Sequence, residues 1–205
     1  MKNNRNFLFY GIGSIAFGIK GNAFSWFLFF YYNMVIGLPA WMASLALAIA
    51  TIWDAISDLI IGYSSDHTKS RLGRRHPYMY AALIPVPIFF VLLWNPPTFD
   101  THFNLFLYLL VMAVLVRTFT TLFEIPNQSL GPEITREYHE RTKMMSLRYF
   151  FGWMGGTVMT ILMYFVFLKP TVEYPNGQLN PDGYQIYGFV AGIIMLGAMI
   201  ISSRG

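Results

Sequence analysis

Two aspartates, Asp54 and Asp58, stand four residues apart inside a long apolar stretch of this 205-residue sequence. In an α-helix this spacing places both carboxylates on one face, where they repel each other unless a proton or a cation lies between them. Na⁺ prefers oxygen ligands, and Ser57 adds a hydroxyl beside the second acid. The spacing predicts a site for Na⁺ or H⁺. The alternative is that basic residues on neighbouring helices neutralise the two acids.

A polar stripe marks a second apolar stretch, where the residues at positions i, i+4, i+7 and i+11 are Arg117, Thr121, Glu124 and Gln128. This face is expected to look inward, because the rest of the stretch is apolar. Arg117 could pair with Asp54 or Asp58, while Glu124 and Gln128 offer the donors and acceptors that a sugar hydroxyl needs. Pro126 either loosens the helix beside these residues or ends it.

Arg148 begins a third polar group and is followed by the aromatic residues Tyr149, Phe150, Phe151 and Trp153. A guanidinium can donate two parallel hydrogen bonds, and aromatic rings stack on the apolar faces of sugars, so this group suits a sugar. The alternative is that the aromatic residues face lipid or anchor the helix at the membrane surface.

The elements that carry these residues belong to a membrane protein. Hydrophobic residues make up 55% of the chain and charged residues only 12%, whereas soluble domains contain about 25% charged residues. The mean hydropathy is +0.46. Six apolar segments of helical length follow one another, which predicts an all-α, polytopic fold, since only helices or closed barrels satisfy their backbone groups in lipid. They cover residues 6–34, 41–64, 77–95, 103–127, 144–168 and 184–203.

The basic residues are distributed unevenly among the connections. Only Lys169 lies in the loops on one side, whereas the other side carries Lys2, Arg5, Lys69, Arg71, Arg74, Arg75, Arg136, Arg141, Lys143 and Arg204. By the positive-inside rule the second side is cytoplasmic, so both termini are predicted to lie in the cytoplasm. The net charge of +4 fits basic loops at a membrane rather than a nucleic-acid surface.

Six ionisable residues lie within the apolar segments, namely Lys20, Asp54, Asp58, Arg117, Glu124 and Arg148. Such residues usually face a cavity and a partner, although they could also form salt bridges that only hold the bundle together. The sequence has no cysteine, no phosphate-binding loop and no common hydrolase motif, which argues against an enzyme. We expect neither a cofactor nor a metal ion beyond Na⁺ at the two aspartates.

Several ordered motifs resemble the major facilitator superfamily, and in particular its glycoside–pentoside–hexuronide:cation symporters. The loop from Gly62 and Asp66 to Gly73, Arg74 and Arg75 resembles the signature between helices two and three. The run from Ile52 to Asp58 is similar to the family's cation-site helix, and the segments at 124–130 and 148–150 are similar to its sugar-site segments. The resemblance covers the whole chain, as the amino-terminal six-helix half of a twelve-helix protein.

The resemblance implies a symporter in the inner membrane and assigns roles to individual residues. The coupling cation would be bound by Asp54, Ser57, Asp58 and Thr121. Sugar would be bound by Glu124, Gln128 and Arg148, with Trp153 as a stacking residue. Where the family pattern has a sugar-binding acid, this chain offers Lys20 and Asn22. The lysine could bind a uronate, or it could neutralise an aspartate and make the cation unnecessary.

The sequence therefore predicts one half of the major facilitator fold, with helices one to three and four to six as inverted repeats and the substrate near the membrane midplane. The opposite wall of the site would come from a missing carboxy-terminal half or from a second copy of the chain. The alternatives to a symporter half are a half-size transporter that works as a dimer and a scaffold or sensor that does not transport. The sequence leaves the sugar unidentified and does not distinguish Na⁺ from H⁺.

Overall fold

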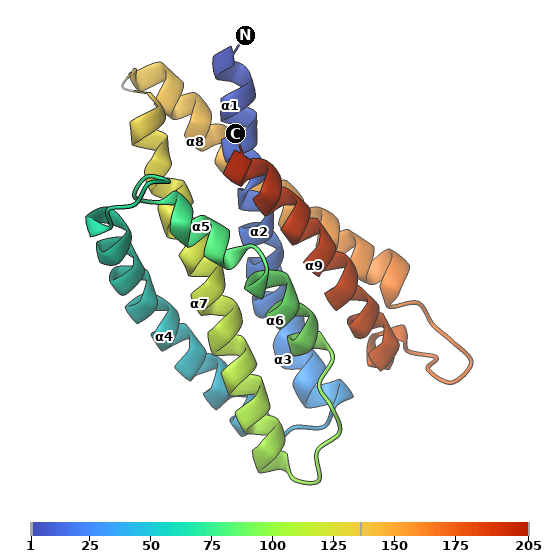
Figure 1. Ribbon diagram of the computed structural model, residues 1–205. Helices are drawn as coiled ribbons and strands as arrows, with labels where there is room; N and C mark the ends of the chain where they lie inside the picture. Colours follow the sequence, from blue (N-terminus) through green and yellow to red (C-terminus); the bar gives the residue numbers. More distant parts are fainter. Residues whose placement is uncertain (1, 136, 205) are drawn as a thin grey trace.

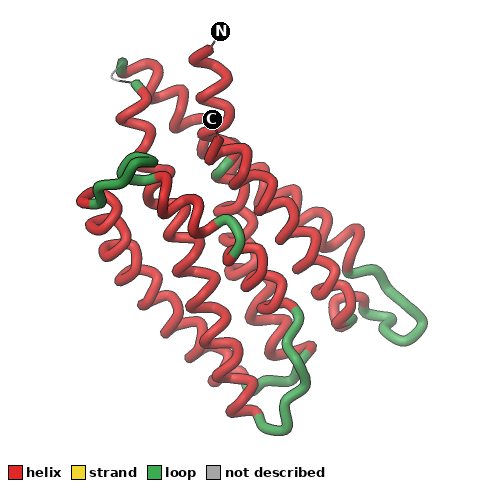
Figure 2. The backbone as a smooth tube through the Cα atoms, in the orientation of Figure 1, coloured by secondary structure: helices red, strands yellow, loops and turns green. Residues whose placement is uncertain are grey.

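The computed structural model describes residues 2–135 and 137–204, and within them the regular structure is helical throughout (Figures 1 and 2). The chain folds into six helical rods. The first contains α1 (Lys2–Ile12), α2 (Ser14–Asn22), the π-helical η1 (Ala23–Phe27), α3 (Leu28–Phe30) and the π-helical η2 (Tyr31–Val35). The others are α4 (Ala40–His67), α5 (His76–Ala82) with α6 (Pro85–Trp94), α7 (His102–Ile134), α8 (Tyr138–Leu162) with the π-helical η3 (Met163–Phe167), and α9 (Pro181–Arg204). A short 3₁₀ turn, η4 (Gly177–Leu179), precedes α9.

Five helices of the described chain are long and apolar enough to cross a membrane. They span Ala40–His67, His76–Trp94, His102–Gly131, Tyr138–Phe167 and Pro181–Arg204. The first rod is not among them, and its longest α-helix, α1, has 11 residues. The protein is thus a multi-pass membrane protein with six helical rods, five of which contain membrane-length apolar spans.

The fourth rod differs from its expected extent. The helix continues past Pro126 to Ile134, so the alternative that Pro126 ends it is wrong. A proline removes one backbone hydrogen bond from a helix, and helices inside a membrane bundle tolerate this loss; Pro126 is buried here.

The rods pack in a symmetric pattern. α2 of the first rod lies along α8 of the fifth, α4 along α7, and α6 along α9 (Figure 1). These are the pairs of rods one and five, two and four, and three and six. When rod one is exchanged with rod four, rod two with rod five, and rod three with rod six, the same three pairs result. This is the pattern expected of two three-helix repeats in half of a major facilitator fold.

The ends of the bundle differ in their loops. The N-terminus, the C-terminus and the basic loop 68–75 lie toward one end, and the loops 95–101 and 168–180 lie toward the other (Figures 1 and 2). Arg136, one of the basic residues assigned to the cytoplasmic side, lies outside the described residues. At the second end, the hydroxyl of Tyr31 donates to the carbonyl of Trp94 (3.1 Å), and that of Tyr32 donates to the carbonyl of Leu93 (2.8 Å). These buried bonds tie the first rod to the third.

The first and fifth rods approach each other through glycines. A β-carbon on Gly18 would lie 1.8 Å from the carbonyl oxygen of Gly152, whereas one on Gly21, a single turn away, would meet nothing within 4 Å. Small residues of this kind let two transmembrane helices approach each other closely. Close contact of these two backbones holds α2 and α8 together beside the polar residues they carry.

We therefore expect Gly18→Ala and Gly21→Ala to have opposite effects. Gly18→Ala forces two backbones apart and should cost at least about 1–3 kcal/mol of stability, the usual range for overpacking. Gly21→Ala makes the same chemical change in open space and should be neutral or stabilising, because alanine favours the helix by about 0.5–1 kcal/mol. Thermal unfolding of the purified variants measures the difference. Equal melting temperatures for the two variants would contradict the close approach.

Candidate transport site

The two aspartates of α4 share one hydrogen-bonding partner on α7. The hydroxyl of Thr121 lies 2.9 Å from Oδ1 of Asp58 and 3.4 Å from Oδ1 of Asp54. Thr121 is buried, and so is Ser57, whose hydroxyl donates to the backbone carbonyl of Asp54 at 2.9 Å. The four residues predicted to bind a cation are therefore close together, on the facing sides of α4 and α7. We call Asp54, Ser57, Asp58 and Thr121 the acidic cluster.

Basic residues reach only one of the two acids. Arg117 donates from Nη1 to Oδ2 of Asp54, which confirms the predicted pairing. The Nζ atom of Lys20 lies 3.5 Å from the same oxygen, and this lysine side chain is only 8% exposed. Among the residues that the structure describes, no basic side chain lies within ion-pair distance of Asp58. The alternative that neighbouring basic residues neutralise the acids thus holds for Asp54 and not for Asp58.

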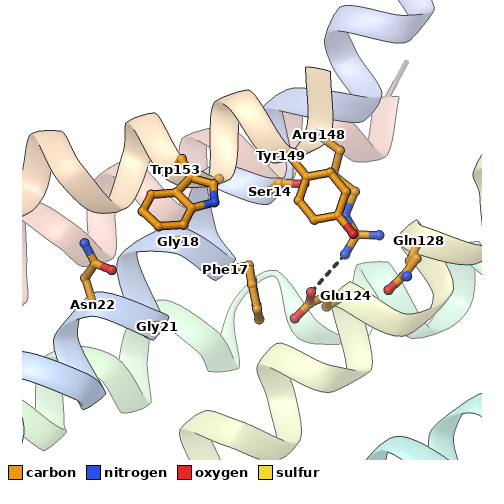
Figure 3. Close-up of a pocket in the computed structure, with 11 residues that line it drawn as sticks. Ser14, Phe17, Gly18, Gly21, Asn22, Glu124, Gln128, Arg148, Tyr149 and Trp153 are labelled. Atoms are coloured by element: carbon orange, nitrogen blue, oxygen red, sulfur yellow. Dashed lines mark hydrogen bonds and ion pairs between the residues drawn. The ribbon is translucent and has the colours of Figure 1, made fainter. Parts of the chain in front are cut away.

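Beside the acidic cluster lies a cavity of about 380 Å³ between α2, α7 and α8 (Figure 3). This volume suits a small ligand of the size of a mono- or disaccharide. Its lining is part apolar and part polar, with Ser14, Phe17, Gly18, Gly21 and Asn22 from α2, Glu124 and Gln128 from α7, and Arg148, Tyr149, Gly152 and Trp153 from α8. The cavity and the acidic cluster share α7, since Thr121 and Glu124 are about one turn apart.

An ion pair crosses the cavity wall. The Nη2 atom of Arg148 donates to Oε1 of Glu124 at 2.9 Å, and this bond joins α8 to α7 (Figure 3). Arg148 is 93% buried, and its Nη1 atom has no hydrogen-bond partner within the described part of the chain. A buried donor without a partner is costly, so a ligand oxygen in the cavity would stabilise it.

The structure brings most of the predicted sugar-binding residues to this cavity. Asn22, Glu124, Gln128, Arg148 and Trp153 line it, whereas Lys20 is not among the lining residues and pairs with Asp54 instead. Asn22 also donates to the hydroxyl of Thr160 at 3.0 Å, which fixes its amide against α8.

Two of the four aromatic residues that follow Arg148 take part in the cavity. Tyr149 and Trp153 line it and are largely exposed, so they stand at its open side. Phe151 packs against the backbone position of Gly11 instead, and Phe150 is an exposed residue outside the lining. The proposal that all four form one sugar-stacking group is thus too broad.

Several neighbours of the site had not been predicted. Thr51, one helical turn before Asp54, accepts a hydrogen bond from Nη2 of Arg117 at 3.1 Å. The guanidinium of Arg117 also lies 4.8 Å from the ring centre of Phe24 on the first rod, at cation–π distance. The only sequence signal for Thr51 is its i, i+3 spacing to Asp54. Phe24 has no such signal, because its position depends on how the rods pack.

The basic loop after α4 has two fixed points. Arg75 donates from Nη2 to Oδ1 of Asp66 at 3.2 Å, and Gly73 has φ = +89°, a conformation that L-residues rarely adopt. Arg74 is exposed in the same loop. Gly62 lies earlier, on α4, and a β-carbon at this position would lie 3.7 Å from Cγ2 of Ile125 on α7. The loop thus links the end of α4 to the start of α5 by a short turn, which the ion pair between Arg75 and Asp66 spans.

Comparison with known proteins agrees with this arrangement of helices and charges, and the similarity covers almost the whole chain. Residues 9–205 match the family model described as MFS/sugar transport protein. The chain belongs to this family. MFS/sugar transport proteins are transporters, so the chain is assigned to a transporter family and not to an enzyme family.

Three known transport proteins align with nearly the full chain. An uncharacterized symporter of Synechocystis sp. is 32% identical over 203 residues, which are 97% of this chain and 37% of the relative. The inner membrane symporter YicJ of Escherichia coli is 28% identical over 193 residues, 94% of this chain and 40% of the relative. The isoprimeverose transporter of Lactiplantibacillus pentosus is 27% identical over 192 residues, 94% of this chain and 39% of the relative. The chain spans less than half the length of these relatives.

Proposed function

We propose that this chain forms the amino-terminal half of a secondary transporter that moves a sugar or glycoside across the inner membrane together with a coupling cation, Na⁺ or H⁺. The observation that carries the proposal is the position of the acidic cluster about one turn of α7 away from a cavity of about 380 Å³. Two relatives bear the name symporter and a third is named for a disaccharide, isoprimeverose, which supports the same conclusion.

The charges around the cavity favour a neutral sugar. Arg148 and Glu124 neutralise each other at 2.9 Å, and Lys20 is occupied by Asp54. A uronate carboxylate would enter a cavity in which the described residues offer no uncompensated positive charge, and its desolvation would not be repaid. Hydroxyl groups need only hydrogen-bond donors and acceptors, which Asn22, Gln128 and Arg148 supply.

Transport of cation and sugar would be coupled because the acidic cluster and the cavity both contain residues of α7. A cation at the acidic cluster and a sugar at Glu124 and Arg148 would both hold α7 against its neighbours, so each would favour the same conformation of the transporter. We expect the opposite wall of the cavity to come from a further six-helix unit, a carboxy-terminal half or a second copy. We place both termini and the basic loop in the cytoplasm, following the distribution of basic residues.

Uptake of radiolabelled isoprimeverose tests this function. Cells that lack their own uptake system and express the complete gene product should take up the label, and unlabelled neutral glycosides should compete. A glucuronide of similar size should not compete, and it serves as the control for charge. Competition by the glucuronide at equal concentration would contradict the assignment to neutral sugars. Failure of every glycoside in a broad set to enter the cells would contradict the proposed function.

A further inference from the structure

The ammonium group of Lys20 takes part in the acidic cluster, although the residue lies 34 positions before Asp54 in the sequence. Its Nζ atom is 3.5 Å from Oδ2 of Asp54, and its side chain is only 8% exposed. The Nζ atom also lies over the ring of Phe17, 5.5 Å from the ring centre. Lys20 is therefore held in this position and is not a surface lysine that reaches inward.

The formal charges show what the ammonium does there. Asp54 and Asp58 contribute two negative charges, and Arg117 contributes one positive charge through its bond to Asp54. These three residues leave one negative charge, which a single monovalent cation would neutralise. Glu124 and Arg148 form their own pair and do not alter this count. Lys20 supplies the missing positive charge from within the protein.

We infer that Lys20 is a tethered cation that takes the place of Na⁺ at the acidic cluster and so excludes Na⁺ as the coupling ion. This inference rests on the proposed function and specifies its ion. A Na⁺ ion bound by the same oxygens would lie next to both Lys20 and Arg117, whose side chains are 8% and 13% exposed, so the repulsion would be only partly screened by solvent. Oδ2 of Asp54, one of the oxygens that would coordinate Na⁺, already has two nitrogen partners. Of the two candidate coupling ions, the proton remains.

Equilibrium binding of ²²Na⁺ to the purified complete protein tests the inference without any sugar. The natural protein should show no saturable Na⁺ binding. Lys20→Ala should create it, because the cluster then carries one uncompensated negative charge. Lys20→Arg keeps the charge and should again show none. The double variant Lys20→Ala, Asp58→Asn should lose the binding that Lys20→Ala creates.

Saturable Na⁺ binding by the natural protein would overturn the inference, and this measurement needs no variant to fold. Absence of Na⁺ binding by a Lys20→Ala protein that unfolds at the same temperature as the natural one would also overturn it. Should Lys20→Ala not fold, Lys20→Gln, which retains more of the side chain, takes its place. None of these outcomes depends on whether sugar is transported, so the proposed function can fail separately, through the absence of glycoside uptake.

Discussion

The Asp58→Asn protein is expected to bind sugar and to exchange it across the membrane, but not to accumulate it against a gradient. Asp58 is the acid of the cluster that no basic residue of the described chain neutralises, and its side chain bonds only to the neutral Thr121. Asparagine has the same shape and can keep a hydrogen bond to Thr121. The change leaves Lys20, Arg117 and Asp54 with a net positive charge, so the cluster no longer attracts a cation. The ratio of internal to external sugar at steady state measures the effect.

Two control variants make this result specific. Asp100→Asn makes the same chemical change at an exposed position in the loop 95–101 and should accumulate sugar normally. Asp54→Asn should behave differently from Asp58→Asn, because it leaves two buried positive charges without their partner, which typically costs about 3–5 kcal/mol. We therefore expect Asp54→Asn to lower the amount of folded protein. Normal accumulation by Asp58→Asn would contradict its role in coupling.

Arg148→Lys is expected to weaken sugar binding by about tenfold to hundredfold, which corresponds to the roughly 1.5–3 kcal/mol of a hydrogen bond to a charged group. The guanidinium of Arg148 holds Glu124 with Nη2 and leaves Nη1 buried without a partner in the described chain. A lysine has a single nitrogen, so it keeps the ion pair with Glu124 but cannot present a second donor in the fixed direction of the fork. Sugar affinity is measured by equilibrium binding of labelled isoprimeverose to the purified complete protein.

The control for this change is Arg204→Lys, at an exposed position at the end of α9, which should leave the affinity unchanged. An Arg148→Lys protein with normal affinity would rule out a contact between Nη1 and the sugar. An Arg148→Lys protein with a much lower melting temperature would show that the residue mainly joins α8 to α7.

Much of the fold was predictable because hydropathy and charge act locally along the chain. The apolar runs identify the helices, and the i, i+4 spacing of Asp54 and Asp58 places them on one face whatever the neighbours do. Arg117 and Thr121 lie on one face of α7 for the same reason, whereas the placement of Thr121 beside the aspartates follows from the family resemblance and not from the spacing. The continuation of α7 past Pro126 could not be foreseen, because a proline in a helical pattern either ends a helix or is accommodated within it.

The position of Lys20 shows where local reasoning stops. The sequence leaves two roles open for its side chain, binding a uronate or neutralising an aspartate, and its contact with Asp54 depends on the rotation of the first rod about its axis. Two π-helical stretches, η1 and η2, follow Lys20 in the same rod, and they change the faces that the later residues of the rod present. The close approach of Gly18 to Gly152 further sets how deeply α2 lies in the bundle. Neither feature has a reliable signature in a single sequence.

The most direct test of cation-coupled sugar transport is accumulation of labelled isoprimeverose by proteoliposomes that contain the complete protein. An inward proton gradient, imposed without any metabolic energy source, should raise internal sugar above the external concentration, and a proton ionophore should return it to equality. An inward Na⁺ gradient in the presence of the ionophore should cause no accumulation. Sugar that only equilibrates under every imposed gradient, or that does not enter at all, would contradict the account.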